Sequence, residues 1–156
     1  MGDEPFYLNK GLLWSLPIFA WYFIPWLIPA IRDELVVIYS PSRIMAIANA
    51  SNGTIFLFAI LVVLAAILEE FFYRGVLVKN LQERTNSPTA VFISAVFFAC
   101  SHFILIEFSV KDFVRYLILG LLFGFAYVST SSCITSILPH MIQNLTAIGI
   151  MWILIS

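Results

Sequence analysis

Long apolar segments separated by short polar stretches make up most of this chain. Five segments stand out, and only brief groups of charged and polar residues interrupt them: 11–31, 55–77, 88–106, 113–130 and 132–155. An α-helix needs about 20 apolar residues to cross a bilayer, so each segment predicts a membrane-spanning helix. We therefore expect an all-α fold, a polytopic transmembrane helix bundle with about five spans.

The composition supports an integral membrane protein with almost no soluble part. Of the 156 residues, 62% are hydrophobic and 11% are charged, and a soluble domain of this length cannot bury so much apolar surface. No repeat or long linker divides the chain. We expect a single domain over residues 1–156, with a motif-bearing core at 55–156, in contact with membrane lipid as a multi-pass protein. In a bacterium this location would be the cell membrane.

Charge and cysteine content exclude two classes of protein. The eight basic residues are scattered singly, so no basic patch is available to follow a phosphate backbone, and we expect no nucleic acid partner. The two cysteines, Cys100 and Cys133, both lie inside apolar segments. A disulfide framework needs more cysteines, so we expect two buried free thiols.

A few ionisable and strongly polar residues lie inside the apolar segments. Such groups are costly at membrane depth, usually face the interior of a helix bundle and often mark a functional site. The second, third and fifth segments carry them: Glu69, Glu70, Arg74, His102, His140, Gln143 and Asn144.

Helical spacing separates the two glutamates. Glu70 and Arg74 are four residues apart, so they share one face of a helix and can pair, which leaves other Arg74 donors for a neighbour. Glu69 is rotated by about 100° from Glu70 and lacks this local partner. A poorly solvated, unpaired carboxylate is suited to accept a proton from water.

The two histidines each belong to a second spaced pair. Phe98 and His102 are four residues apart, which places the aromatic ring one turn below the imidazole. His140 and Asn144 have the same spacing and present two hydrogen-bond donors on one face. Such a pair can stabilise an oxyanion.

Each of these features also has a purely structural interpretation. Glu70 and Arg74 can form an ion pair that only locks helices together, and a membrane histidine or Asn144 can serve as an interhelical hydrogen-bonding group. Gly120 and Gly124 have the small-xxx-small spacing that lets helices pack closely. The occurrence of all three polar motifs on three helices favours a catalytic site.

The three motifs together resemble those of the CPBP family, the CaaX-protease and bacteriocin-processing (Abi) membrane peptidases, which includes the Ras-converting CaaX endopeptidase. The matching stretches are Glu69-Glu70-Phe71-Phe72-Tyr73-Arg74-Gly75, Phe98-Ala99-Cys100-Ser101-His102 and His140-Met141-Ile142-Gln143-Asn144. Their order along the chain and their placement on apolar segments match as well. The resemblance covers about residues 60–150.

The resemblance implies an intramembrane endopeptidase that acts near the C-terminus of a membrane-associated protein or peptide, with a prenylated CaaX-type substrate as one candidate. Glu69 would be the general base that activates water, and His102 would assist it. His140 and Asn144 would form the oxyanion hole. Glu70 and Arg74 would support and orient these groups.

Two alternatives stay open at this stage. Glu69, His102 and His140 are the right residue types for a three-ligand zinc site, although the zincin spacing is absent because the two histidines are far apart in the chain. We favour the metal-free, glutamyl mechanism without a cofactor, and Zn is the alternative. The chain could instead be a non-catalytic membrane bundle, such as a bacteriocin immunity protein.

Overall fold

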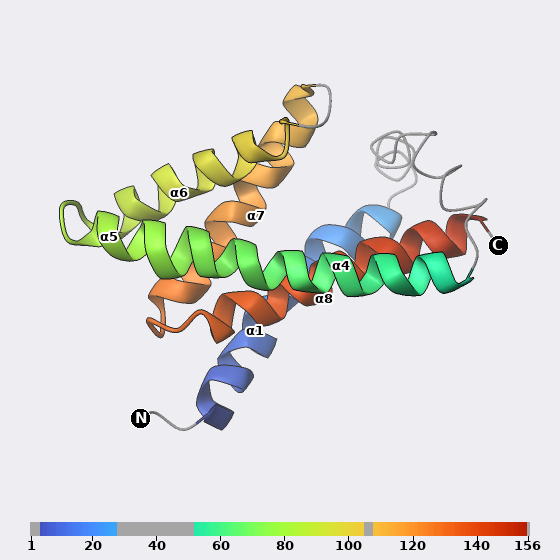
Figure 1. The fold of residues 1–156 in the computed structure, drawn as a ribbon, viewed down its shortest axis with the longest axis horizontal. Helices are drawn as coiled ribbons and strands as arrows, with labels where there is room; N and C mark the ends of the chain where they lie inside the picture. Colours follow the sequence, from blue (N-terminus) through green and yellow to red (C-terminus); the bar gives the residue numbers. More distant parts are fainter. Residues whose placement is uncertain (1–3, 28–51, 105–107, 156) are drawn as a thin grey trace.

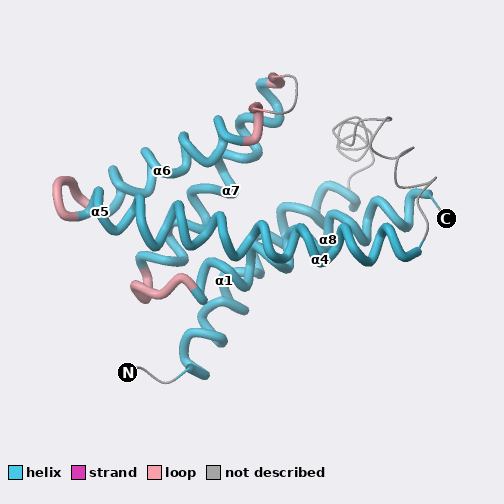
Figure 2. Tube along the Cα trace, in the orientation of Figure 1, coloured by secondary structure: helices cyan, strands magenta, loops and turns pink. Residues whose placement is uncertain are grey.

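A computed structural model describes residues 4–27, 52–104 and 108–155, and Figure 2 shows only helices and connecting loops in these ranges. The predicted all-α fold is confirmed, and a helical segment lies on each of the five predicted spans. In chain order, the elements are α1 (Glu4–Leu27), α4 (Asn52–Glu70), η1 (Phe71–Val78), α5 (Lys79–Gln82), α6 (Ser87–Ser101), α7 (Val110–Val128) and α8 (Ile134–Ile155).

Two predicted boundaries differ from those in the structure. The first helix begins at Glu4 rather than at residue 11, and residues 28–31 of the predicted span lie outside the described residues. The third span was predicted to run to residue 106, whereas α6 ends at Ser101. His102 consequently caps the C-terminus of α6 and does not lie inside the helix.

The elements α4, η1 and α5 follow one another without a break and form one long rod (Figure 1). Within the described residues, the stretch Gly53–Gln82 is the one helix long and apolar enough to cross a membrane, by length and composition, and α6 is a shorter apolar helix. Many large apolar side chains of α4 are exposed, among them Phe56, Leu61 and Leu68. An exposed apolar face of this extent suits contact with lipid.

A π-helix occupies η1, which the sequence analysis did not predict. A π-helix has a wider turn than an α-helix, is rare, and often occurs at functional sites. One of its backbone carbonyls, that of Tyr73, accepts a hydrogen bond from Ser94 Oγ of α6 over 3.1 Å. Helix α6 thus provides a hydrogen-bond donor for one backbone carbonyl of η1.

Polar residues mark the start of α6 and of α7. Asn86 precedes α6, and its side-chain oxygen accepts a hydrogen bond from the backbone N–H of Thr89 over 2.9 Å. Pro88 lies in the first turn, where its missing N–H costs no helical hydrogen bond. Ser109 caps α7 in the same way through the N–H of Asp112.

The helices pack mainly as neighbouring pairs. The most extensive contacts join α6 to α7, α1 to α8, and α4 to α8 (Figure 1). Gly120 and Gly124 of α7 face α6: a Cβ atom at Gly124 would lie 2.6 Å from Val91 Cγ1, and one at Gly120 would lie 3.0 Å from Ala95 Cα. The predicted packing role of both glycines is confirmed.

Gly124→Ala should destabilise the protein. The new methyl group would overlap the stiff side chain of Val91, and such overpacking typically costs about 1–3 kcal/mol. This cost should exceed the gain of about 0.5–1 kcal/mol that alanine brings to a helix. Thermal unfolding in detergent measures the difference.

Gly149→Ala in α8 is the matched control for this substitution. A Cβ atom at Gly149 has nothing within 4 Å, so only the gain in helix propensity remains. We expect its unfolding temperature to equal or exceed that of the unmodified protein. An equal rise in both variants would contradict the packing role of Gly124.

Candidate active site

A buried ion pair on one continuous helix lies at the centre of the site. Glu70 is the last residue of α4, Arg74 lies in η1, and both side chains are fully buried. Arg74 Nη1 donates a hydrogen bond to Glu70 Oε1 over 3.0 Å. The predicted pair is confirmed, although the helix that carries Arg74 is of the π type.

Arg74 also connects the ion pair to α7. Its Nη2 donates to the backbone carbonyl oxygen of Gly120 over 2.7 Å. The guanidinium carbon lies 5.0 Å from the centre of the Phe98 ring, 5.6 Å from that of Phe123 and 5.8 Å from that of Tyr73. A planar guanidinium makes forked hydrogen bonds and lies well against aromatic rings, whereas a lysine ammonium cannot reproduce this geometry.

His140 of α8 lies between the two adjacent carboxylates. Its Nδ1 is 2.8 Å from Glu70 Oε1, and its Nε2 is 3.7 Å from Glu69 Oε2. An ionised carboxylate only accepts hydrogen bonds, so Nδ1 carries a hydrogen and donates it to Glu70. With Nδ1 bonded to Glu70, Nε2 is the nitrogen that faces Glu69.

The two glutamates differ in their exposure to solvent. The side chain of Glu70 is 0% exposed and that of Glu69 is 35% exposed. Of the two carboxylates, only Glu69 is therefore open to a water molecule from outside. This difference in exposure agrees with the prediction that the two neighbouring side chains point in different directions.

Asn144 lies one turn beyond His140 and faces the same neighbouring helix. Its Nδ2 donates to the backbone carbonyl oxygen of Val62 in α4 over 3.1 Å. An amide nitrogen has two hydrogens, so a second N–H remains for a ligand. With His140 Nδ1 bonded to Glu70, the donors for an oxyanion are this N–H and a protonated His140 Nε2. The oxyanion role of the two residues stays a prediction.

His102 is held by the carbonyl of the residue one turn before it. Its Nδ1 lies 2.8 Å from the backbone oxygen of Phe98. A carbonyl only accepts, so Nδ1 carries the hydrogen, and Nε2 is the accepting nitrogen of the neutral ring. The ring centres of Phe98 and His102 lie 4.7 Å apart, which confirms the predicted contact. An imidazole in this state can act as a base.

The ring of Phe98 joins the two histidines into one site. It meets His102 edge-on at 4.7 Å and His140 edge-on at 5.7 Å between ring centres. Phe98 itself is buried. Thus Glu69, Glu70 and His140 meet directly, and His102 is connected to them through its contact with the same aromatic ring.

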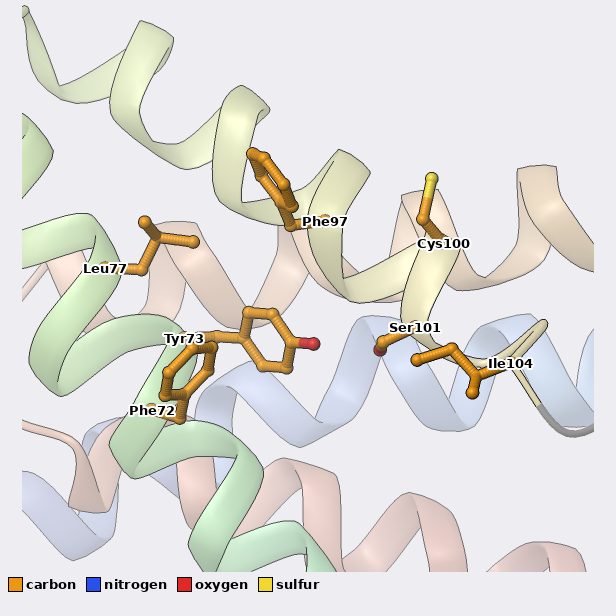
Figure 3. A pocket seen from close by; sticks show the side chains of 7 residues that line it. All are labelled: Phe72, Tyr73, Leu77, Phe97, Cys100, Ser101 and Ile104. Carbon is orange, nitrogen blue, oxygen red and sulfur yellow. The ribbon is translucent and has the colours of Figure 1, made fainter.

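An apolar pocket of about 390 Å³ lies beside this site, between η1 and the end of α6 (Figure 3). Figure 3 shows the Tyr73 hydroxyl pointing across the pocket toward Ser101. The other lining residues are Phe72, Leu77, Phe97, Cys100 and Ile104. Most of them are exposed, so the pocket opens at the protein surface. Pockets of roughly 300–1,000 Å³ are typical of small-ligand sites.

The cysteine prediction needs a correction. Both thiols are free, as expected, but Cys100 is exposed at the pocket and Cys133 is only partly buried. An apolar residue need not be buried where a helix has a face toward lipid. Apolar surroundings in the sequence therefore did not indicate burial.

The zinc alternative requires Glu69, His102 and His140 to direct their donor atoms at one point. Within the ranges that the structure describes, no group of three or more His, Cys, Asp and Glu residues could hold a metal ion. Nδ1 of each histidine donates to an oxygen atom, from Glu70 or from the backbone of Phe98, and such bonds occur in histidines with or without a bound metal. The metal-free mechanism and the zinc alternative therefore both stay predictions.

Some contacts of the site have no counterpart in the sequence analysis. The bond between Glu70 and His140 joins residues 70 positions apart, and no spacing rule indicates it. The rings of Tyr116 and Phe123 on α7 stack on the two histidines, although α7 carries none of the three motifs. Aromatic residues are common in such segments, so these two gave no distinctive signal.

Comparison with known proteins gives one match. The family model of type II CAAX prenyl endopeptidase Rce1-like proteins matches residues 51–146, which include all three motifs. Neither the curated proteins nor the solved structures give a significant match. The family consists of membrane-embedded helical proteases of the CAAX type. The matched region covers most of the chain, and the chain therefore belongs to the Rce1-like family of type II CAAX prenyl endopeptidases.

Proposed function

We propose that this protein is an intramembrane glutamyl endopeptidase that hydrolyses a peptide bond near the C-terminus of a prenylated, CAAX-type membrane protein. The observation that carries the proposal is the meeting of the motifs at His140, whose two nitrogens face Glu70 and Glu69. The family supports the general class of substrate. The geometry supports the assignment of chemical roles.

Glu69 is the general base in this proposal. It is the more exposed of the two carboxylates, so it can take a proton from a water molecule as the water oxygen attacks the scissile carbonyl carbon. His102 assists through Nε2. The proton then passes to the leaving amine nitrogen, and Glu69 returns to its ionised state.

His140 and Asn144 stabilise the tetrahedral intermediate in this proposal. Their N–H groups donate to the oxyanion that develops from the scissile carbonyl oxygen. Glu70 acts through His140, because it accepts the Nδ1 hydrogen and so leaves Nε2 as the nitrogen that faces the substrate. Arg74 in turn fixes Glu70.

A multi-pass arrangement accounts for the exposed apolar side chains of the bundle. Large apolar residues are exposed on four helices besides α4, among them Leu13, Phe97, Val114 and Leu145. In water this surface would cause aggregation, whereas in a bilayer it contacts lipid. We propose that the five helical segments all cross the membrane.

The pocket beside the site is the proposed binding place of the substrate's lipid chain. It is apolar, and exposed Phe97 and Cys100 lie at its wall, where a chain can enter from the bilayer. Tyr73 separates the pocket from the catalytic groups, since its ring packs on Phe98 at 5.4 Å between ring centres. A chain held here would bring the adjoining peptide toward the two histidines.

Glu69→Gln should abolish peptide cleavage while the protein stays folded. The amide has nearly the same shape as the carboxylate but cannot accept the proton from water. Asn144→Ala should reduce kcat by about 10²–10³, the usual effect of losing an oxyanion donor. Cleavage of prenylated reporter peptides by purified protein in detergent measures both, with thermal unfolding as the control for folding.

The same assay separates the alternatives when it is repeated with a strong chelator. Cleavage that resists the chelator and is absent in Glu69→Gln supports the glutamyl mechanism. Cleavage that the chelator abolishes would replace it with the zinc mechanism. A Glu69→Gln protein with full biological function would favour a non-catalytic bundle.

Cys100→Trp should weaken the binding of prenylated substrates selectively. The larger side chain would occupy part of the pocket, so KM should rise several-fold at little change in kcat, the pattern expected when only ground-state binding is lost. Phe92→Trp, at an exposed position of α6 outside the pocket, is the matched control. A similar rise in KM for unprenylated reporters would argue against a lipid pocket.

Arg74→Met should lower stability by about 3–5 kcal/mol, because it leaves the Glu70 carboxylate buried without its cation. The double variant Glu70→Gln, Arg74→Met removes both charges and should regain much of this loss. It should not regain activity, since His140 then lacks its carboxylate acceptor. Thermal unfolding and the peptide assay test both statements, and a double variant with normal kcat would disprove the positioning role of Glu70.

A further inference from the structure

Helix α7 carries none of the three motifs, yet one of its faces contacts every one of them. Tyr116, Gly120 and Phe123 follow at spacings of four and three residues, so they lie on one face of the helix. Tyr116 stacks on His102, Gly120 accepts the hydrogen bond from Arg74, and Phe123 stacks on His140.

The two stacked contacts are similar in geometry. The rings of Tyr116 and His102 lie 3.8 Å apart between centres at an interplanar angle of 24°. Those of Phe123 and His140 lie 4.5 Å apart at 17°. Both histidines of the chain thus lie nearly flat on an aromatic ring from α7.

Each imidazole also makes one hydrogen bond, and this bond alone leaves the plane of the ring free to turn. Nδ1 of His102 is bonded to the Phe98 carbonyl, and Nδ1 of His140 is bonded to Glu70. A bond through one ring atom does not by itself define the plane of the ring. A flat aromatic neighbour defines that plane, and bond and stack together fix the direction of Nε2.

The need for this support is greatest at His102. It lies at the C-terminal cap of α6, where the helix ends, and its ring is only partly buried. The edge of Phe98 contacts it on one side. Tyr116 is the neighbour whose ring is nearly parallel to it.

We infer that α7 positions both site histidines, with Tyr116 holding His102 and Phe123 holding His140, so that each Nε2 points at the reacting groups. The consequence for activity rests on the proposed function, whereas the positioning itself does not. Tyr116 and Phe123 act through the histidines and are positioning residues. Tyr116 and Phe123 should act independently, because each ring contacts a different imidazole.

The test observes the nitrogen signals of the two imidazoles directly, because the chain has only 2 histidines. NMR spectra of ¹⁵N-histidine-labelled protein in detergent should show two rings, which His140→Gln assigns. In the unmodified protein, His102 should have a protonated Nδ1 and an unprotonated Nε2. Tyr116→Leu should move the His102 nitrogen signals toward those of a mixture of tautomers and leave His140 unchanged.

Three further variants serve as matched controls. Phe123→Leu should shift the signals of His140 and leave those of His102 unchanged. Tyr116→Phe keeps the aromatic face and should preserve the spectrum of His102. Tyr7→Leu makes the same change on α1, where Tyr7 packs on Phe6, and should affect neither histidine.

Activity provides the second readout. Tyr116→Leu should lower kcat by about 10-fold or more at unchanged KM, since a small misplacement of a catalytic group can cost up to about 10² in rate. Tyr116→Phe should keep kcat close to that of the unmodified protein. Tyr116→Met, whose flexible side chain can adapt to the space of the ring without its flat face, replaces Tyr116→Leu if that variant does not fold.

The outcomes separate this inference from the proposed function. Unchanged His102 signals in Tyr116→Leu or Tyr116→Met would overturn the positioning role, whatever the activity. Shifted signals in a protein that cleaves no reporter would support the positioning role and count against the proposed function. A fall in kcat of equal size in Tyr116→Phe would assign the effect to the hydroxyl group and overturn the role of the stack.

Discussion

One buried carboxylate oxygen, Oε1 of Glu70, accepts hydrogen bonds from both Arg74 and His140. Removing a charge from water is costly, and a buried ion pair is stable only where the geometry is good and further hydrogen bonds are made. Three parts of the bundle supply these contacts here: the α4–η1 rod carries the pair, α8 brings the imidazole, and α7 brings a backbone carbonyl. Glu70 Oε2 and Arg74 Nε are buried without a hydrogen-bond partner among the described residues. The packing of these helices and the hydrogen bonding of the site residues therefore depend on the same few contacts.

Gly120 shows how closely packing and electrostatics are connected. The absence of a side chain lets α7 approach α6 so closely that a Cβ atom would lie 3.0 Å from Ala95 Cα. At this close position the Gly120 carbonyl lies 2.7 Å from Arg74 Nη2. The hydrogen bond gives Nη2 of the buried guanidinium an acceptor, and a buried donor without one is costly. A glycine chosen for close packing thus also contributes to the environment of the ion pair.

Sequence reasoning located the five helices, the Glu70–Arg74 pair, the Phe98–His102 contact and the packing glycines, because each follows from local periodicity. It did not find the π-helix, since its sequence has no signature distinct from an α-helix. It also missed the Glu70–His140 bond, which depends on how α8 packs against α4. Spacing showed which residues share a face of one helix. Which faces meet was decided by tertiary packing, and so the supporting role of α7 was visible only in the structure.

The length of the rod Gly53–Gln82 determines how deep the chemistry lies. Its 30 residues correspond to about 45 Å at the rise of an α-helix, whereas the hydrocarbon core of a bilayer is about 30 Å thick. Glu69 lies near the middle of this rod, so the carboxylates are far from both aqueous phases when the rod crosses the membrane. Hydrolysis consumes one water molecule for each bond cleaved. In the proposed mechanism, the supply of water to Glu69 is therefore as much a part of turnover as the entry of the peptide, and the exposed side of Glu69 is the place where the two reactants would arrive together.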